Sequence, residues 1–238
     1  MKHNQLFLKV LGGAVGLCLC AGTANAVTLT HISSDQEMNE LMDDIAFVAE
    51  GRIGDLDGFA THELNLHESD PGQPDITDQF NWQNGVTEQF ELSYDATSQL
   101  VNFNIGDRTL THTYDDPFSD IFLRTRAVNE GSDIRVDNLF LDGVALNDAS
   151  HAVAETGGLD ILRIADIEEN FTLTGDATMN WEDTETPPTQ SRLAFQVKIS
   201  EPSPEPEPRK EIPEPSTVVS LVVLGLTGVG MRRTVHNQ

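Results

Sequence analysis

The feature that most constrains the fold is an alternation of apolar and polar residues in short segments through the middle of the chain. In residues 193–199, for example, Leu193, Phe195, Val197 and Ile199 would all face one way. A period of two predicts β-strands with one buried face, because successive side chains of a strand point to opposite sides. Gly, Asp, Asn and Pro separate the segments, and Asp142-Gly143 is a hairpin-turn signal. Such segments lie at 62–66, 89–94, 101–105, 108–114, 121–128, 135–141, 144–146, 170–175, 177–181 and 193–199.

Many short strands with such turns predict an all-β fold, an antiparallel β-sandwich of jelly-roll type. A short helix is expected near its start. Ser34 followed by Glu37 forms a capping box, and Met38 and Leu41 continue at helical spacing. We expect this helix to give way to a strand near Phe47.

The N-terminal segment, residues 1–26, has the features of a secretory signal peptide. Lys2 and Lys9 give it a positive start, and residues 10–21 are apolar. Ala24 and Ala26 match the small-x-small cleavage rule, so the mature chain should begin at Val27 and reach the membrane through the Sec translocon. A lipoprotein signal is the alternative, but Leu17 and Leu19 stand where a lipobox needs a small residue before Cys18 or Cys20.

The predicted cleavage removes both cysteines, so the mature chain would have no disulfide. The remaining chain is strongly acidic. All 39 acidic residues but only 10 of the 14 basic residues lie between positions 27 and 215, which gives 10 − 39 = −29. This balance disfavours a nucleic-acid partner, because phosphate binding needs a basic surface.

Three segments follow one another at the C-terminus. Residues 201–211 are rich in Pro and Glu and predict an extended linker. Pro213, Glu214 and Pro215 come next, then a predominantly apolar run at 218–231, and finally Arg232 and Arg233. As a hydrophobic helix this run would span about 21 Å, against a hydrocarbon core of about 30 Å. We therefore expect transient membrane insertion, with the arginines on the cytoplasmic side.

Residues 212–234 closely resemble the PEP-CTERM sorting signal of exosortase substrates, on the strength of Pro213-Glu214-Pro215, the apolar run and Arg232-Arg233. The resemblance implies membrane retention, recognition and cleavage by an exosortase near the Pro-Glu-Pro, and delivery to the cell surface or extracellular matrix. An ordinary single-pass tail helix is the alternative, and it leaves the Pro-Glu-Pro unexplained.

The body, residues 27–200, resembles the choice-of-anchor domains, in particular type W. The resemblance rests on GRIGDLDGF at 51–59, FELSYDATSQLVNFNIG at 90–106, DIRVDNLFLDGVAL at 133–146, and NFTLTGDATMNWEDTETPPTQSRLAFQVKIS at 170–200. It implies a β-sandwich on a surface protein attached by a sorting tail. It implies no catalytic residues.

Candidate site residues in the body are few. Two acidic loops could hold Ca²⁺, a hard cation that takes oxygen ligands, although Asp also favours turns by itself. Trp82 and Trp181 could stack on sugars or fill the core. His62, Glu63 and His67 resemble a zinc motif, but the histidines are five apart instead of four. The loops contribute Asp55 and Asp57, and Asp115, Asp116 and Asp120.

These observations favour a non-enzymatic protein with a structural or adhesive role at the cell surface or in the matrix. The sequence contains no nucleophile elbow, phosphate loop or dinucleotide fingerprint. No cofactor is required, and Ca²⁺ stays a candidate. The alternatives are a carbohydrate-binding module of an exopolysaccharide matrix and, less favoured, a glycoside hydrolase with two facing carboxylates.

Overall fold

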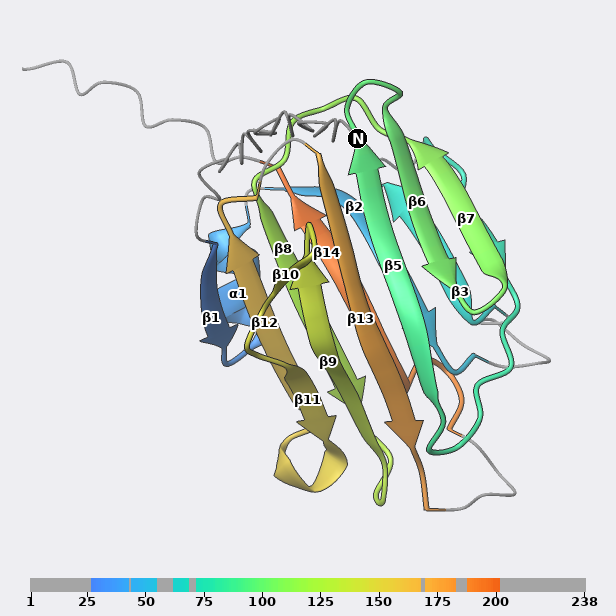
Figure 1. The fold of residues 1–238 in the computed structure, drawn as a ribbon. Helices are drawn as coiled ribbons and strands as arrows, with labels where there is room; N and C mark the ends of the chain where they lie inside the picture. Colours follow the sequence, from blue (N-terminus) through green and yellow to red (C-terminus); the bar gives the residue numbers. More distant parts are fainter. Residues whose placement is uncertain are drawn as a thin grey trace, which may run out of the picture. The chain divides into compact units, whose positions relative to one another are not determined.

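The computed structural model describes residues 27–42, 44–54, 62–68, 72–167, 170–182 and 188–201. Their strands form two antiparallel sheets, which confirms the predicted all-β sandwich (Figure 1). We call them sheet A and sheet B. In spatial order, sheet A consists of β1 (Thr28–Ile32), β12 (Leu159–Ala165), β8 (Asp120–Ala127), β14 (Leu193–Ser200), β2 (Ile45–Arg52), β3 (Leu64–Glu68) and β4 (Ile76–Asp78).

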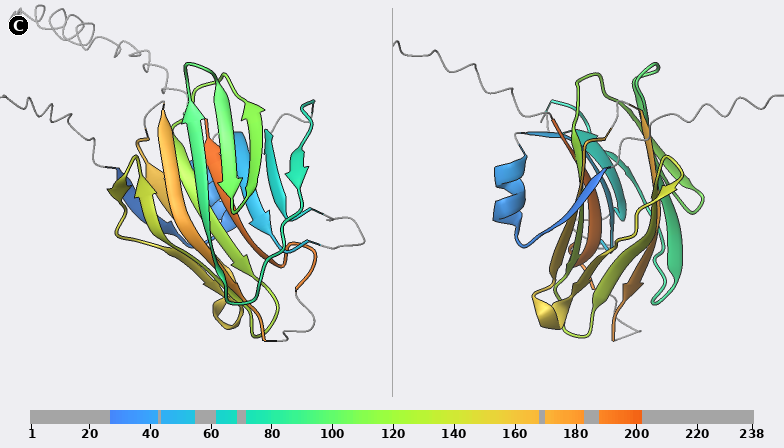
Figure 2. Two further views of the ribbon diagram at one scale, coloured as in Figure 1. Left: turned by 45° about the vertical axis from the view of Figure 1, so that its right-hand side comes forward. Right: turned by 60° about the vertical axis from the view of Figure 1, so that its left-hand side comes forward.

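Sheet B faces the reader in Figure 1, with sheet A behind it. In spatial order it consists of β10 (Val144–Ala145), β9 (Asp133–Leu141), β13 (Phe171–Asn180), β5 (Thr87–Asp95), β6 (Leu100–Ile105) and β7 (Arg108–Thr113). A further strand, β11 (Ser150–Val153), pairs with β9 and is followed by the 3₁₀ turn η1 (Ala154–Thr156). Figure 2 shows the two sheets as separate layers.

The pairing of strands that are far apart in the sequence identifies the type of sandwich. In sheet A, β2 pairs with β14 and β8 pairs with β12, while in sheet B β5 pairs with β13 and β9 pairs with β11. Among these eight strands, taken in sequence order, the first (β2) pairs with the last (β14), the second (β5) with the second-last (β13), and so on, with successive pairs alternating between the sheets. This nested order is that of a jelly roll, so the predicted type of sandwich is confirmed.

The core lies between the two sheets. It is built from the inward-facing residues of both, including the fully buried rings of Phe47, Phe103 and Phe195. Phe195 of β14 lies in ring contact with Phe90 of β5 across the layers, at a centroid distance of 5.3 Å. Such contacts join the sheets by apolar burial, the dominant favourable term in folding.

The predicted helix is α1 (Asp35–Leu41). The Ser34 side chain accepts a hydrogen bond from the Glu37 backbone N–H, which is one half of the capping box, and the Glu37 carboxylate accepts from the Ser33 backbone N–H instead of that of Ser34. The helix lies on the outer face of sheet A (Figure 2, right), where Met38 packs against Phe122 and Ile161. The following strand begins at Ile45, two residues before the expected change near Phe47.

Two predictions about where strands end have different outcomes. Asp142 and Gly143 both have positive φ and join β9 to β10 as a two-residue hairpin, as predicted. Residues 170–175 and 177–181 were predicted as two separate segments, but β13 runs through residue 176 and joins them. Gly175 instead permits close packing, since a Cβ there would lie 2.7 Å from Cε1 of Phe90.

β12 was not predicted, because its sequence does not alternate. Leu162 and Ile164 face the main core, whereas Ile161 contacts the helix side of sheet A. A strand covered on both faces has no period of two.

Several expected features lie outside the described residues: the signal peptide with Ala24 and Ala26, the linker, the sorting signal and the C-terminal hydrophobic helix. In the part of the chain that the structure describes, no helix is long and apolar enough to cross a membrane.

Candidate functional site

Sheet B presents a polar face to the solvent. On β5, Phe90, Leu92 and Tyr94 are buried, while Glu91 and Ser93 between them are partly exposed. The same alternation on β6, β9 and β13 gives a face of hydroxyl, amide and carboxylate groups. The outer face of sheet A, by contrast, carries α1. Within the part of the chain that the structure describes, sheet B is therefore the open side of the sandwich.

The strand register aligns four outward side chains in one row across sheet B. Thr174 of β13 lies opposite both Phe140 of β9 and Glu91 of β5, and Glu91 lies opposite Asn104 of β6. Because neighbouring strands are about 4.8 Å apart, the row presents a ring, a hydroxyl, a carboxylate and an amide at regular intervals. We call Phe140, Thr174, Glu91 and Asn104 the cross-strand row.

A β-bulge turns Phe140 outward. The register between β13 and β9 shifts between Thr174 and Asp176, and Asn138 on β9 has a φ of 49°. Ile134 and Val136 face inward before the bulge, and Leu139 and Leu141 face inward after it. The extra residue reverses the alternation and leaves Phe140 41% exposed.

The cross-strand row lines a hollow of about 330 Å³ on the open face of sheet B. Asn104 Nδ2 donates to Glu91 Oε1 at 3.1 Å, and Asn138 Nδ2 donates to Asp176 Oδ2 at 2.8 Å. These bonds fix the orientation of both carboxylates. A carboxylate has about four acceptor positions, so Glu91 and Asp176 can also accept hydrogen bonds from a ligand. The hollow thus offers oriented acceptors, amides and an apolar ring.

A second hollow, of about 460 Å³, adjoins the first and shares Asn138 and Phe140 with it. Its lining includes the ion pair between Arg135 Nε and Asp137 Oδ2, at 2.5 Å, and Asp148. Phe140 therefore stands where the two hollows meet. The combined surface is longer than either hollow alone.

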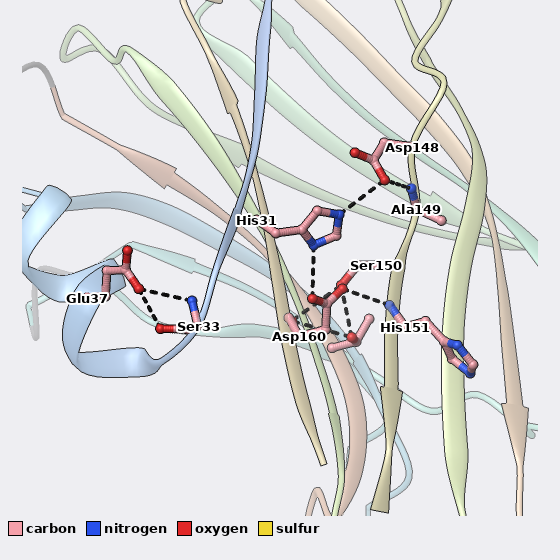
Figure 3. Close-up of polar contacts among 9 residues, drawn as sticks. His31, Ser33, Glu37, Asp148, Ala149, Ser150, His151 and Asp160 are labelled. Carbon is pink, nitrogen blue, oxygen red and sulfur yellow. Dashed lines mark hydrogen bonds and ion pairs between the residues drawn. The ribbon is translucent and has the colours of Figure 1, made fainter. Parts of the chain in front are cut away.

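Asp148 also belongs to a cluster around His31 of β1 (Figure 3). His31 Nε2 lies 3.1 Å from Asp148 Oδ1, and its Nδ1 lies 3.0 Å from Asp160 Oδ1. Burial alone would lower the pKa of His31, but the hydrogen bonds to Asp148 and Asp160 outweigh it and raise the pKa. The imidazolium form can donate to both carboxylates at once.

Ser150 lies near this cluster without being activated by it. Its hydroxyl lies 2.9 Å from Thr125 Oγ1 and donates to the carbonyl oxygen of Asp160 at 3.3 Å. His31 has carboxylates at both ring nitrogens, so it is not placed to act as a base for Ser150. The geometry is that of a clamp holding β1 to β12 and to the segment before β11.

Trp82 and Trp181, the candidates for sugar stacking, are both buried. Trp82 packs edge-on against Phe195 and Phe80, at centroid distances of 6.2 and 4.8 Å. Trp181 belongs to the same core cluster. The exposed ring on sheet B is that of Phe140.

The candidate Ca²⁺ ligands are not gathered into one described group. Asp120 is buried, and its Oδ2 accepts hydrogen bonds from Arg163 Nε and Nη2 at 2.9 and 2.5 Å. Asp115 and Asp116 are exposed, and Asp55 and Asp57 lie outside the described residues. The described ranges contain no group of three or more His, Cys, Asp or Glu side chains that could hold a metal ion.

The His62 to His67 segment is partly in β3. The ring of His62 lies against the Arg52 guanidinium, and burial together with this cation lowers the pKa of His62. Burial raises the pKa of Glu63, which accepts a hydrogen bond from the Phe80 backbone N–H at 3.3 Å. His67 lies on β3 itself. A neighbouring cation disfavours a metal ion at His62.

None of the four residues of the cross-strand row was predicted from the sequence as a site residue. One local signal was present, since Asp137-Asn138 interrupts the alternation of 134–141 with two polar residues in succession. That pattern is typical of a bulge. After it, Phe140 points to the face of the strand opposite to Leu139 and Leu141. Neither a protein-family model nor a curated protein sequence matches the chain.

Proposed function

We propose that this chain is an exported, non-enzymatic protein with an adhesive role at the cell surface or in the extracellular matrix. The observation that carries the adhesive role is the open face of sheet B, where a polar hollow and an exposed ring lie side by side. Binding sites for extended ligands are commonly built from convergent polar groups around an aromatic contact. The second candidate, a carbohydrate-binding module, is favoured by the same hollow.

The proposed route to the surface uses the two ends of the chain. The Sec translocon exports it, and cleavage after Ala26 releases the N-terminus. The C-terminal helix holds it transiently in the inner membrane until an exosortase cuts near Pro213-Glu214-Pro215. The described strands extend from Thr28 to Ser200, so the sandwich fits between these two segments.

The non-enzymatic role is supported by how the polar clusters are used. His31 is held between carboxylates, Ser150 is bonded to Thr125, and Asp120 is bonded to Arg163. Each of these groups serves a contact between strands. The glycoside hydrolase alternative would need Glu91 and Asp176, which both line the hollow, to act on a bound sugar.

The sorting proposal can be tested with a control from the same chain, because the tripeptide Pro-Glu-Pro also occurs in the linker. Pro213-Glu214-Pro215 should be changed to three alanines, and Pro204-Glu205-Pro206, the same tripeptide within the linker, should be changed likewise as the control. Fractionation of the native host and immunodetection then report processing and location. We expect the 213–215 variant to accumulate uncut in the inner membrane, and the 204–206 variant to reach the surface normally. Normal processing of the 213–215 variant would refute the sorting proposal.

A further inference from the structure

We infer that the hollow of sheet B binds a neutral polysaccharide that lies across the strands, with Phe140 against a sugar ring. This inference rests on the proposed adhesive function and names its ligand. The cross-strand row runs perpendicular to the strands, so a ligand following it meets Phe140, Thr174 and Glu91 in turn. A chain of linked sugar rings can extend along such a row.

The charge of the site selects against anionic partners. Glu91 and Asp176 line the hollow, and the whole chain carries a formal net charge of −25. The lining of the first hollow contains no Lys or Arg, and Arg135 in the second hollow is paired with Asp137. Uronic-acid polymers, phosphorylated lipids and nucleic acids would be repelled. The uncharged hydroxyls of a neutral glycan are donors that match these carboxylates.

The hydrogen-bonding groups are already oriented before a ligand arrives. Glu91 is held by Asn104, and Asp176 is held by Asn138 of the bulge. Their positions are set by strand pairing rather than by loops, so little ordering is needed on binding. An amide beside each carboxylate offers further donors and acceptors, which suits a ligand whose hydroxyls act as both.

Phe140 supplies the apolar contact. Its ring is 41% exposed, and the bulge directs it outward between the two hollows. Sugar rings have apolar C–H faces, and an aromatic ring can cover such a face while the hydroxyls bond to the neighbouring residues. Loss of this contact should weaken binding more than loss of any single hydrogen bond, because aromatic anchors dominate binding energies.

The test measures binding of the full chain, purified in mild detergent, to soluble polysaccharides by calorimetry and by affinity electrophoresis. The neutral probes are a β-glucan, a galactan and a mannan, the anionic probe is alginate, and the cationic probe is a chitosan oligomer. The variants are Phe140→Ala and Phe140→Trp. Leu41→Ala on α1 is the matched control, because Leu41 is also 41% exposed but lies on the side of sheet A.

We expect at least one neutral probe to bind, and Phe140→Ala to bind it about tenfold or more weakly. Phe140→Trp should retain binding, and Leu41→Ala should bind like the wild type. Thermal unfolding of each variant separates loss of the ring from loss of the fold. Binding to chitosan or alginate alone, equal binding by wild type and Phe140→Ala, or no binding to any neutral probe would overturn the inference.

Two further measurements test whether the hollow has another occupant or another role. Self-association that is abolished by Phe140→Ala would assign the face to a second copy of the chain and overturn the glycan assignment. Release of reducing ends from a bound glycan would contradict the non-enzymatic role. Because binding is measured on purified protein, its failure is distinguishable from a failure of sorting, which the 213–215 variant reports in cells.

Discussion

At the scale of single residues, several polar pairs of this acidic sandwich join distant parts of the chain. His31 on the edge strand β1 contacts Asp148 and Asp160, more than a hundred positions away in the sequence. Asp120 at the start of β8 contacts Arg163 of β12. Because a buried or half-buried charge needs a partner, each pair ties one strand to another.

The His31 clamp predicts a pH-dependent contribution to stability. The pKa of His31 is raised above 6.5 in the folded chain, so folding favours the protonated form. The stabilisation is fully present below pH 6.5 and is lost as the pH rises through the folded pKa. His31→Gln should lower the free energy of unfolding at about pH 5.5 by less than about 1 kcal/mol, since the side chain is half exposed, and have no effect at about pH 9.

Urea unfolding of wild type and His31→Gln at both pH values checks this, with His151→Gln on β11 as a control histidine that pairs with one carboxylate only. An effect of the same size at both pH values would show that His31 acts by packing rather than by charge.

Asp120 provides a test of the acidic loop around Pro117. Because Arg163 already occupies its carboxylate, Asp120→Asn should destabilise the fold by about 1–3 kcal/mol whether or not Ca²⁺ is present. Melting temperatures in millimolar Ca²⁺ and in chelator check the expectation. A Ca²⁺-dependent rise in the wild-type melting temperature that Asp120→Asn abolishes would instead make Asp120 a Ca²⁺ ligand.

At the scale of secondary structure, the strand β9 and its hairpin were predicted from the sequence, but the bulge within it was not. The alternation of residues 135–141 predicted a strand, and Asp142-Gly143 predicted its hairpin. At Asn138 the alternation of inward and outward side chains reverses. This reversal depends on pairing with β13, which lies more than thirty residues away in the sequence. Register between distant strands is set by tertiary packing, so the composition of the cross-strand row was not predictable from local pattern.

The bulge itself is testable at this scale. Asn138 has a positive φ, which Asn and Gly tolerate better than other residues, and its amide bonds to Asp176. Asn138→Ala should cost about 1–3 kcal/mol of stability, from backbone strain and the lost hydrogen bond, whereas Asn138→Gly should cost less. Equal losses in the two variants, measured by urea unfolding, would mean that the left-handed conformation of residue 138 stores no strain.

At the scale of the whole molecule, the two-layer architecture was predictable because it follows from alternation and turns alone. The nested pairing that starts with β2 and β14 is compatible with that pattern and was predicted as a jelly roll. The two tryptophans show why surface chemistry was harder to predict. Neither lies within a strand, since Trp82 precedes β5 and Trp181 follows β13, and the packing of the two sheets buries both rings.

Among the described residues, α1 covers one face of the sandwich, and the other face, that of sheet B, carries the proposed binding groups on its strands. The proposed ligand of this open face is a glycan. The most direct measurement is a titration of ¹⁵N-labelled protein with the neutral oligosaccharide that binds best, followed by backbone amide chemical shifts. Glycan binding at the cross-strand row should shift the amides of Phe140, Thr174, Glu91 and Asn104 and leave those of α1 unaffected. Shifts confined to sheet A or α1, or no saturable shifts at all, would contradict it.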